Sequence, residues 1–188
     1  MRMKELYCCM ASAAFFGFAA CFPAAAQEAL QAAQRDFMSI AAGEAESALR
    51  SGEGGPFGAV VVKEGAVVGC GHNRVLLRQD PTCHAEIEAI RDACRRLGTH
   101  DLSSCELYTS CYPCPMCLGA AIWSNIKVVY YGNTAKDAAE IGFRDDYIYH
   151  FIEDGRKDDM ILRLEQKDRE KTIKAFREFA AQKEKKLY

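Results

Sequence analysis

Apolar residues recur along the chain with two different periods, and these periods predict alternating helices and strands. Over residues 28–49 the apolar positions are spaced as on one face of a helix, which ends in the Gly/Pro-rich segment SGEGGPFG. Two Val-rich runs in AVVVKEGAVVGCG flank Glu64 and Gly65 and predict a β-hairpin. A second helical spacing follows the turn at residues 80–82 and stops at Gly98.

The middle of the chain predicts a strand–helix–strand unit. CELYTS is typical of a strand, PMCLGAAIWSNI of a helix with Pro115 in its first turn, and KVVYYG of another strand. Strands joined through a helix lie parallel, whereas a hairpin is antiparallel, so we expect an α/β protein with a mixed sheet. After Gly132 we expect a short helix in TAKDAAEIGF, a strand in MILRLE and a polar amphipathic helix in REKTIKAFREFAAQKEK.

The first 26 residues differ in composition from the rest. Arg2 and Lys4 precede an apolar stretch that ends in small residues, which is the pattern of a secretory signal peptide cleaved after Ala26. Cleavage before Cys21, as in a lipoprotein, a misassigned start codon and a buried N-terminal helix are the alternatives. We expect a periplasmic or secreted protein if the segment is a signal, and a cytoplasmic one otherwise. The predicted divisions are a signal peptide (1–26), a main domain (27–155) and a C-terminal segment (156–188).

Charge and cysteine content narrow the classes of partner. The formal net charge of −2 creates no global basic field, so we expect no nucleic-acid partner. No segment beyond the N-terminal one reaches the ~20 apolar residues of a membrane span. The chain has ten cysteines, and an odd number of them outside the signal region, clustered around one histidine, favours a metal site over a disulfide framework. Export would favour disulfides, so the redox state stays open for Cys70, Cys83, Cys94, Cys105 and Cys111.

Two short motifs predict a catalytic zinc site. Cys114 and Cys117 form Cys-x-x-Cys at a predicted helix start, where free N–H groups and the positive end of the helix dipole stabilise thiolates. His84 supplies a third ligand, which leaves the fourth zinc position to water. Glu86 reaches that water only if His84 precedes the regular helix, and it then acts in proton transfer.

The combination CHAE and PCPMC resembles the His-x-Glu…Pro-Cys-x-x-Cys signature of zinc nucleobase deaminases. Similarity to bacterial guanine deaminases extends from about Phe37 onward, through GGPFGAVVVKEG, DPTCHAEIEAIRDAC, LYTSCYPCPMCLGA, DAAEIGF and REFAAQKEKKLY. The chain departs from that family at Cys83 and Tyr112, where Ala and Glu are common. A closed structural zinc site, with Cys83 or Cys111 as a fourth ligand, and a dithiol redox site are the alternatives to a catalytic centre.

The resemblance implies a three-layer α/β/α, cytidine deaminase-like fold with a central mixed sheet and a Zn²⁺ cofactor. It implies hydrolysis of guanine to xanthine and ammonia: an activated water attacks C2, and Glu86 delivers protons to N3 and then to the leaving amine. It also implies a homodimer in which the C-terminal segment is swapped and Tyr188 caps the partner's cavity. The implied site residues are Glu86 and Asp145 for catalysis, His84, Cys114 and Cys117 for metal, and Asn73, Phe57, Phe143 and Tyr188 for the purine.

Two other functions remain open from the sequence. One is a deaminase of a different base, such as cytosine or ammeline, or of adenosine in tRNA. The other is an exported zinc-binding protein without catalytic activity.

Overall fold

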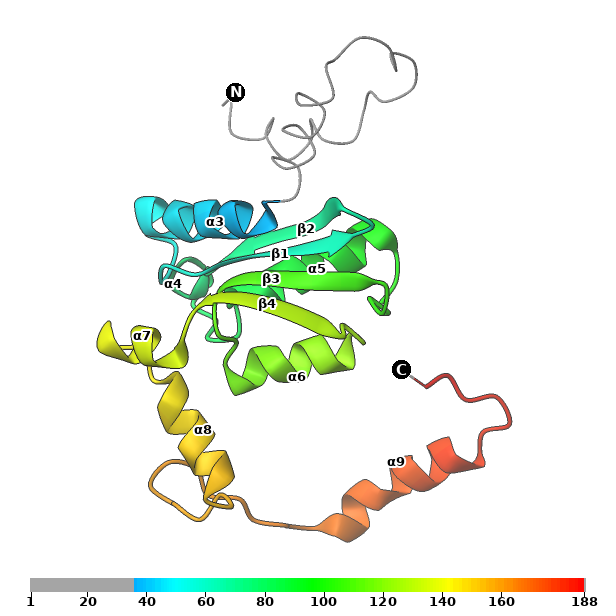
Figure 1. The fold of residues 1–188 in the computed structure, drawn as a ribbon. Helices are drawn as coiled ribbons and strands as arrows, with labels where there is room; N and C mark the ends of the chain where they lie inside the picture. The colour runs from blue at the N-terminus through cyan, green and yellow to red at the C-terminus, as the bar shows by residue number, and fades with distance from the viewer. Residues whose placement is uncertain (1–35, 188) are drawn as a thin grey trace, which may run out of the picture. The chain divides into compact units, whose positions relative to one another are not determined.

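The computed structural model describes residues 36–187, so the expected signal peptide and Tyr188 lie outside the described residues. Within that range a four-stranded sheet carries the fold (Figure 1). The elements in chain order are α3 (Phe37–Ser51), β1 (Gly58–Lys63), β2 (Ala66–His72), α4 (Val75–Arg78), α5 (Ala85–Leu97), β3 (Cys105–Cys111), α6 (Pro115–Trp123), β4 (Val128–Asn133), α7 (Ala135–Glu140), α8 (Asp145–Glu153) and α9 (Arg169–Ala181).

The sheet has the strand order β2-β1-β3-β4 and is mixed, as the sequence predicts. β1 pairs antiparallel with both β2 and β3, and β3 pairs parallel with β4 through the connecting helix α6. The β1–β2 hairpin turns at Glu64 and Gly65, whose φ angles of 51° and 76° both lie in the left-handed region. Two left-handed residues in succession give a turn whose twist suits a two-residue hairpin.

Helices cover both faces of the sheet and create two core clusters. On one face, Ala59 and Val61 of β1 pack with Leu107 of β3 and the alanines of α5. On the other, Val60 and Val62 pack against Phe37 and Ala41 of α3. Successive strand residues point to opposite faces, so a strand covered on both sides is apolar throughout. The arrangement confirms the three-layer expectation (Figure 1).

The segment after β4 differs from the sequence expectation in two places. MILRLE is not a strand: residues 162–165 have no regular structure. Within residues 36–187 the sheet contains only β2, β1, β3 and β4, so this segment pairs with none of them, and an unpaired strand is not stable alone. Helix α8 falls outside the predicted elements, whereas α7 and α9 fall inside the predicted helical segments.

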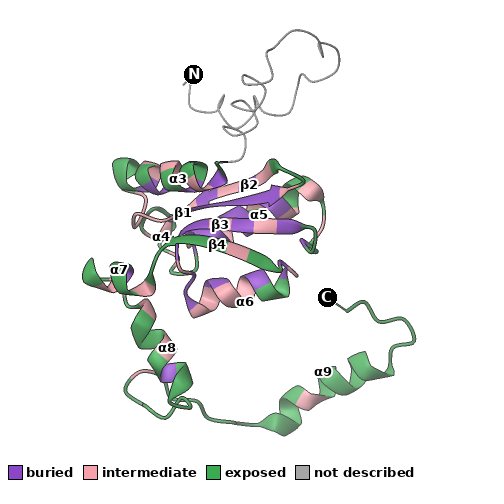
Figure 2. Ribbon diagram, in the orientation of Figure 1, coloured by how far each residue is buried: buried purple, intermediate pink, exposed green. Residues whose placement is uncertain are grey.

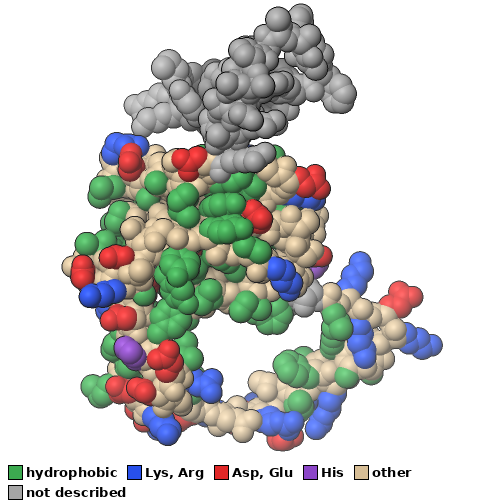
Figure 3. Space-filling model, in the orientation of Figure 1, with side chains coloured by type: hydrophobic (Ala, Val, Ile, Leu, Met, Phe, Trp, Pro, Cys, Tyr) green, Lys and Arg blue, Asp and Glu red, His purple; other side chains and the backbone are tan. Residues whose placement is uncertain are grey.

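Much of the surface after β3 is apolar and exposed. Burial drops from β3 to β4 and remains low in α8 and α9 (Figure 2). Figure 3 shows hydrophobic side chains gathered over the β4 edge of the sheet, where Tyr130 and Tyr131 are 44% and 48% exposed. Trp123 on α6 is 67% exposed. None of the helices between residues 36 and 187 combines the length and apolar character that crossing a membrane requires.

Candidate active site

The three expected metal ligands come from the starts of two helices. His84 is the N-cap of α5 and Cys114 the N-cap of α6; both have extended backbone angles, and neither side chain makes a capping hydrogen bond. Cys117 lies in the first turn of α6, after Pro115. His84 thus precedes the regular helix, which is the condition under which both His84 and Glu86 can reach one metal-bound water. The free N–H groups and positive dipole ends of both helices therefore face the ligands.

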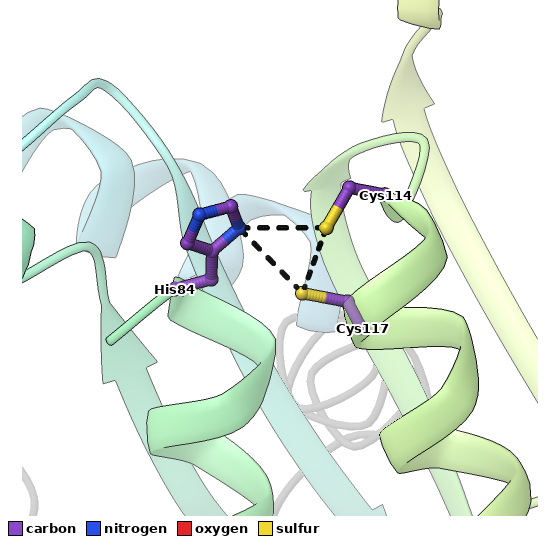
Figure 4. A group of neighbouring side chains, drawn as sticks. All are labelled: His84, Cys114 and Cys117. Atoms are coloured by element: carbon purple, nitrogen blue, oxygen red, sulfur yellow. Dashed lines mark hydrogen bonds between the residues drawn. The ribbon is translucent and has the colours of Figure 1, made fainter. Parts of the chain in front are cut away.

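The three donor atoms form a nearly equilateral triangle (Figure 4). His84 Nδ1 lies 3.6 Å from Cys114 Sγ and 3.7 Å from Cys117 Sγ, and the two sulfur atoms are 3.6 Å apart. In a tetrahedral site with ordinary Zn–S and Zn–N bonds these edges measure about 3.6–3.8 Å. The residues present therefore fit a zinc ion.

The electrostatics of this triangle favour the ligand form of Cys114. The hydrogen bond with Cys117, and next the one with His84, lower the pKa of Cys114 to about 4. The same pairing raises the pKa of Cys117, because two thiolates at this separation repel each other. A divalent cation between them reverses that preference, since a coordinating thiol is deprotonated outright.

Glu86 lies against this triangle and is 6% exposed. Its Oε1 accepts a hydrogen bond of 3.1 Å from the Thr109 hydroxyl, and its Oε2 lies 3.4 Å from Cys117 Sγ. Burial raises the pKa of the carboxyl above its usual range. The side chain is thus fixed in orientation and suited to carry a proton.

Neither alternative fourth ligand joins the group. The sulfur of Cys83 contacts Asp80 and Arg91, and the thiol of Cys111 contacts the Thr134 carbonyl at 3.5 Å. The metal-binding group found among residues 36–187 contains only His84, Cys114 and Cys117. Three protein ligands are the usual set of a catalytic zinc site. None of the seven cysteines within the described range forms a disulfide.

A cavity of about 420 Å³ opens beside the metal ligands. Besides His84, Glu86 and Cys114, it is lined by four residues that the sequence assigned to substrate or catalysis, namely Phe57, Asn73, Phe143 and Asp145. The expected contact from Tyr188 lies outside the described residues. The fold therefore brings together predicted residues from five separate stretches of the chain.

Asn73 forms one wall of the cavity and is 4% exposed. Its Oδ1 accepts hydrogen bonds from the backbone N–H groups of Gly55 at 3.3 Å and Val75 at 3.2 Å. These bonds fix the amide so that its NH₂ group remains available to a ligand. Gly54 permits the arrangement, because a Cβ there would lie only 2.1 Å from Asn73 Oδ1.

Other residues that line the cavity are aromatic or acidic. Phe57 and Phe143 meet edge to face, with ring centroids 4.6 Å apart. A Cβ on Gly55 would lie 2.6 Å from the Phe143 ring, so Gly55 makes room for that ring as Gly54 does for Asn73. Asp145 begins helix α8, and burial together with the nearby Cys114 raises the pKa of its carboxyl. The cavity thus offers an amide, a carboxylate and two flat rings.

Sequence reasoning missed two residues around this site, Thr109 and Tyr149, and noted a third, Tyr112, only as a departure from the family pattern. Thr109 holds Glu86, Tyr112 lines the cavity, and Tyr149 donates a hydrogen bond to the Pro113 carbonyl. Thr109 could have been found, because it lies two residues after Leu107 on the buried face of a strand, and a polar side chain there needs a partner.

An ionic cluster supports the outer side of the Asn73 wall. His72 places Nδ1 2.8 Å from Glu44 and Nε2 2.9 Å from Glu53, and Arg74 contacts Glu53 at 3.2 Å. The hydrogen bond with Glu44 is the main cause of the raised pKa of His72. The cluster joins α3, the glycine-rich loop and the end of β2.

Known proteins share this arrangement. Residues 31–133 match the cytidine and deoxycytidylate deaminase zinc-binding region. Guanine deaminase of Bacillus subtilis (strain 168) is 54% identical over 105 residues, covering 56% of this chain and 67% of that protein. The crystal structure of guanine deaminase from Bacillus subtilis has a TM-score of 0.69 at 44% identity, covering 79% of this chain and 96% of that one.

A more distant relative has a different name. The tRNA-specific adenosine deaminase of Aquifex aeolicus is 46% identical over 95 residues, covering 50% of this chain and 62% of that protein, so the chain spans less than two thirds of its length. The region shared with the family contains His84, Glu86, Cys114 and Cys117, takes up more than half of the chain, and identifies the metal as zinc. With its three-layer fold and this metal centre, the chain belongs to the family that carries the cytidine and deoxycytidylate deaminase zinc-binding region.

Proposed function

We propose that the protein hydrolyses guanine to xanthine and ammonia. The observation that carries the proposal is a single cavity in which Glu86 lies against three zinc-binding side chains while Asn73 and Asp145 line the space in front of them. Deamination of a base needs an activated water, a proton carrier beside it and polar groups that orient the base. All three requirements have a candidate in this cavity.

Zinc held by His84, Cys114 and Cys117 supplies a water that ionises near neutral pH. Glu86 takes one proton of the attacking water and delivers it to N3 of the base. It then takes the second proton of that water and delivers it to the amine, which leaves as ammonia while the oxygen becomes the 2-carbonyl of xanthine. The Thr109 hydroxyl holds Oε1 at 3.1 Å, so the other carboxylate oxygen remains directed toward the metal ligands. Burial keeps Glu86 away from competing solvent.

The base is held by three kinds of contact in this proposal. The NH₂ group of Asn73 donates to an acceptor of the purine, because its oxygen is already engaged by two backbone N–H groups. Asp145 accepts from the N1–H and amine of guanine, which are both donors. Phe57 and Phe143 supply apolar surface for the flat ring.

A tRNA adenosine substrate is the second candidate, supported by the relative with that name. Two observations favour guanine. The structural match to the Bacillus subtilis guanine deaminase covers 96% of that protein's chain, so the similarity extends beyond the metal-binding region. In addition, Asp145 and Asp146 stand together at the start of α8, and neighbouring acids repel a phosphate backbone.

The test is a substrate panel. The purified zinc-loaded protein is incubated with guanine, cytosine, adenosine, ammeline and a tRNA carrying the editable adenosine, and ammonia release is measured. We expect turnover of guanine with kcat/KM at least ~10⁴ M⁻¹s⁻¹. Ammonia from the tRNA and none from guanine would transfer the assignment to the second candidate, and no turnover at all would favour a non-catalytic zinc-binding protein.

We also propose a homodimer in which residues 156–188 cross to the partner subunit and Tyr188 caps its cavity. The support is the apolar surface that one chain leaves uncovered: Tyr130 and Tyr131 on β4, Trp123 on α6, and Phe176 on α9, which is 75% exposed. Light scattering should give about twice the mass of one chain. A variant truncated after residue 155 should lose activity; a monomeric full-length chain would refute this arrangement.

The cellular location depends in our proposal on residues 1–26. If they are cleaved after Ala26 the enzyme is exported, and if they are kept it acts in the cytoplasm in purine breakdown. N-terminal sequencing of the natural protein distinguishes the two, since the exported form begins at Gln27.

A further inference from the structure

Helix α8 carries a cavity residue but has few attachments to the rest of the protein. Asp145, its first residue, lines the cavity. Within the helix only Phe151 is buried, and most of its surface is exposed (Figure 2). A carboxylate on so exposed a helix keeps a fixed position only if specific contacts hold the helix in place.

Tyr149 makes such a contact. Its hydroxyl donates a short hydrogen bond to the backbone carbonyl of Pro113, which immediately precedes the metal ligand Cys114. Pro113 is among the most deeply buried residues. Burial raises the pKa of the Tyr149 phenol, so the group stays protonated and remains a donor.

Aromatic contacts extend this anchor. The Tyr149 ring lies 5.8 Å from that of Tyr112, and Tyr112 meets Tyr131 of β4 edge to face at 5.0 Å. The cluster thus joins α8 to the end of β3 and to β4. It uses Tyr112, one of the two positions at which the sequence departs from the pattern of bacterial guanine deaminases.

Asp145 and Tyr149 are four residues apart in one helix, so they lie on the same face. One face of α8 therefore presents the carboxylate to the cavity and the phenol to the metal-binding loop. Phe143, just before the helix, is held by Phe57. A helix attached at one end only can swing, whereas attachment at Phe143 and again at Tyr149 fixes its first turn.

We propose that Tyr149 is a positioning residue that fixes the Asp145 carboxylate relative to the metal-binding loop by bonding to the Pro113 carbonyl. The inference rests on the proposed function, because it assumes that Asp145 contacts the substrate. Tyr149 itself does not line the cavity and acts through the helix.

The first test does not depend on turnover. Tyr149→Phe removes the hydroxyl and keeps the ring, and Tyr147→Phe, which alters a 43% exposed tyrosine on the same helix, is the matched control. Amide hydrogen exchange is followed in zinc-loaded protein. We expect the α8 amides of Tyr149→Phe to exchange up to about tenfold faster, as for one lost hydrogen bond, with α5 and α6 unchanged. Unaltered exchange in α8 would overturn the anchor.

The second test asks whether the effect passes through Asp145. kcat and KM for guanine are measured for Tyr149→Phe, Asp145→Asn and the double variant, with zinc content as a check. We expect Tyr149→Phe to lower kcat/KM about tenfold or more, with zinc retained, and the double variant to be no worse than Asp145→Asn alone. Multiplied losses in the double variant, or loss of zinc, would reduce Tyr149 to a structural residue.

Failure of the two proposals can be told apart. A wild-type protein inactive on guanine refutes the proposed function and removes the role assigned to Asp145, while the exchange experiment still decides whether Tyr149 anchors α8. An active wild type with equal kinetics in Tyr149→Phe and Tyr147→Phe refutes the positioning role and leaves the function intact.

Discussion

Gly54 gives the sharpest test of how the cavity wall is built. In Gly54→Ala the new Cβ would lie 2.1 Å from Asn73 Oδ1 and 2.5 Å from the Asn73 carbonyl oxygen. Ordinary van der Waals contact begins at 3.4 Å, so the Asn73 side chain or the loop must shift by about 1.3 Å. One of the crowded atoms belongs to the backbone, so a change of rotamer cannot relieve the clash. A misplacement of about 1 Å at a substrate-positioning group costs about 100-fold in rate.

The assay compares steady-state guanine deamination in Gly54→Ala, in Gly43→Ala and in the wild type. Gly43 lies inside α3, and an added Cβ there would meet no atom within 4 Å. Its alanine variant should keep wild-type kinetics and gain up to about 1 kcal/mol of stability from helix propensity. Gly54→Ala should lose about 100-fold in kcat/KM while retaining zinc, because the metal ligands lie on α5 and α6. Wild-type kinetics in Gly54→Ala would show that the position of Asn73 is not critical.

Three further outcomes are expected. Glu86→Gln should retain zinc by elemental analysis but lose at least ~100-fold in kcat; a smaller loss would remove its role as proton carrier. Glu44 and Glu53 raise the pKa of His72. The stabilisation that protonated His72 gives the folded protein is therefore complete below its pKa in the unfolded chain, about 6.5, and is lost as the pH rises through its pKa in the folded protein. His72→Gln should therefore lower the free energy of unfolding in urea by about 1–2 kcal/mol at pH 6 and by less at pH 9; an equal loss at both would contradict the charged pairing. A chelator should abolish activity and expose Cys114 to alkylation, and added Zn²⁺ should restore activity; rapid alkylation of the zinc-loaded protein would contradict ligation.

The sequence predicts the central layers of the fold well because their signals are local. Val-rich runs around Glu64 and Gly65 can form little other than a hairpin, and the strand–helix–strand order requires a parallel crossover. The metal ligands are predictable for a related reason: His84 and Cys114 both precede helix starts marked by turn residues and by Pro115.

Later parts of the chain are less predictable because their structure depends on contacts with segments that are distant in the sequence. MILRLE alternates like a strand, yet strand formation needs a neighbouring strand to accept its hydrogen bonds. Helix α8 combines acids and aromatics whose roles appear only once Asp145 lies at the cavity and Tyr149 at Pro113. Thr109 is a similar case, since its importance depends on Glu86 arriving from another helix.

The match to the family ends at residue 133, the last residue of β4. Phe143 and Asp145, which line the cavity, come later, after helix α7. In our proposal Phe57, Asn73 and the metal ligands therefore lie inside the shared region, whereas Phe143 and Asp145 lie in a segment that follows it. If the proposed roles hold, exchanging that segment alters two of the contacts to the base and leaves the metal ligands in place. Grafting residues 134–155 onto a relative of different specificity is the corresponding engineering route.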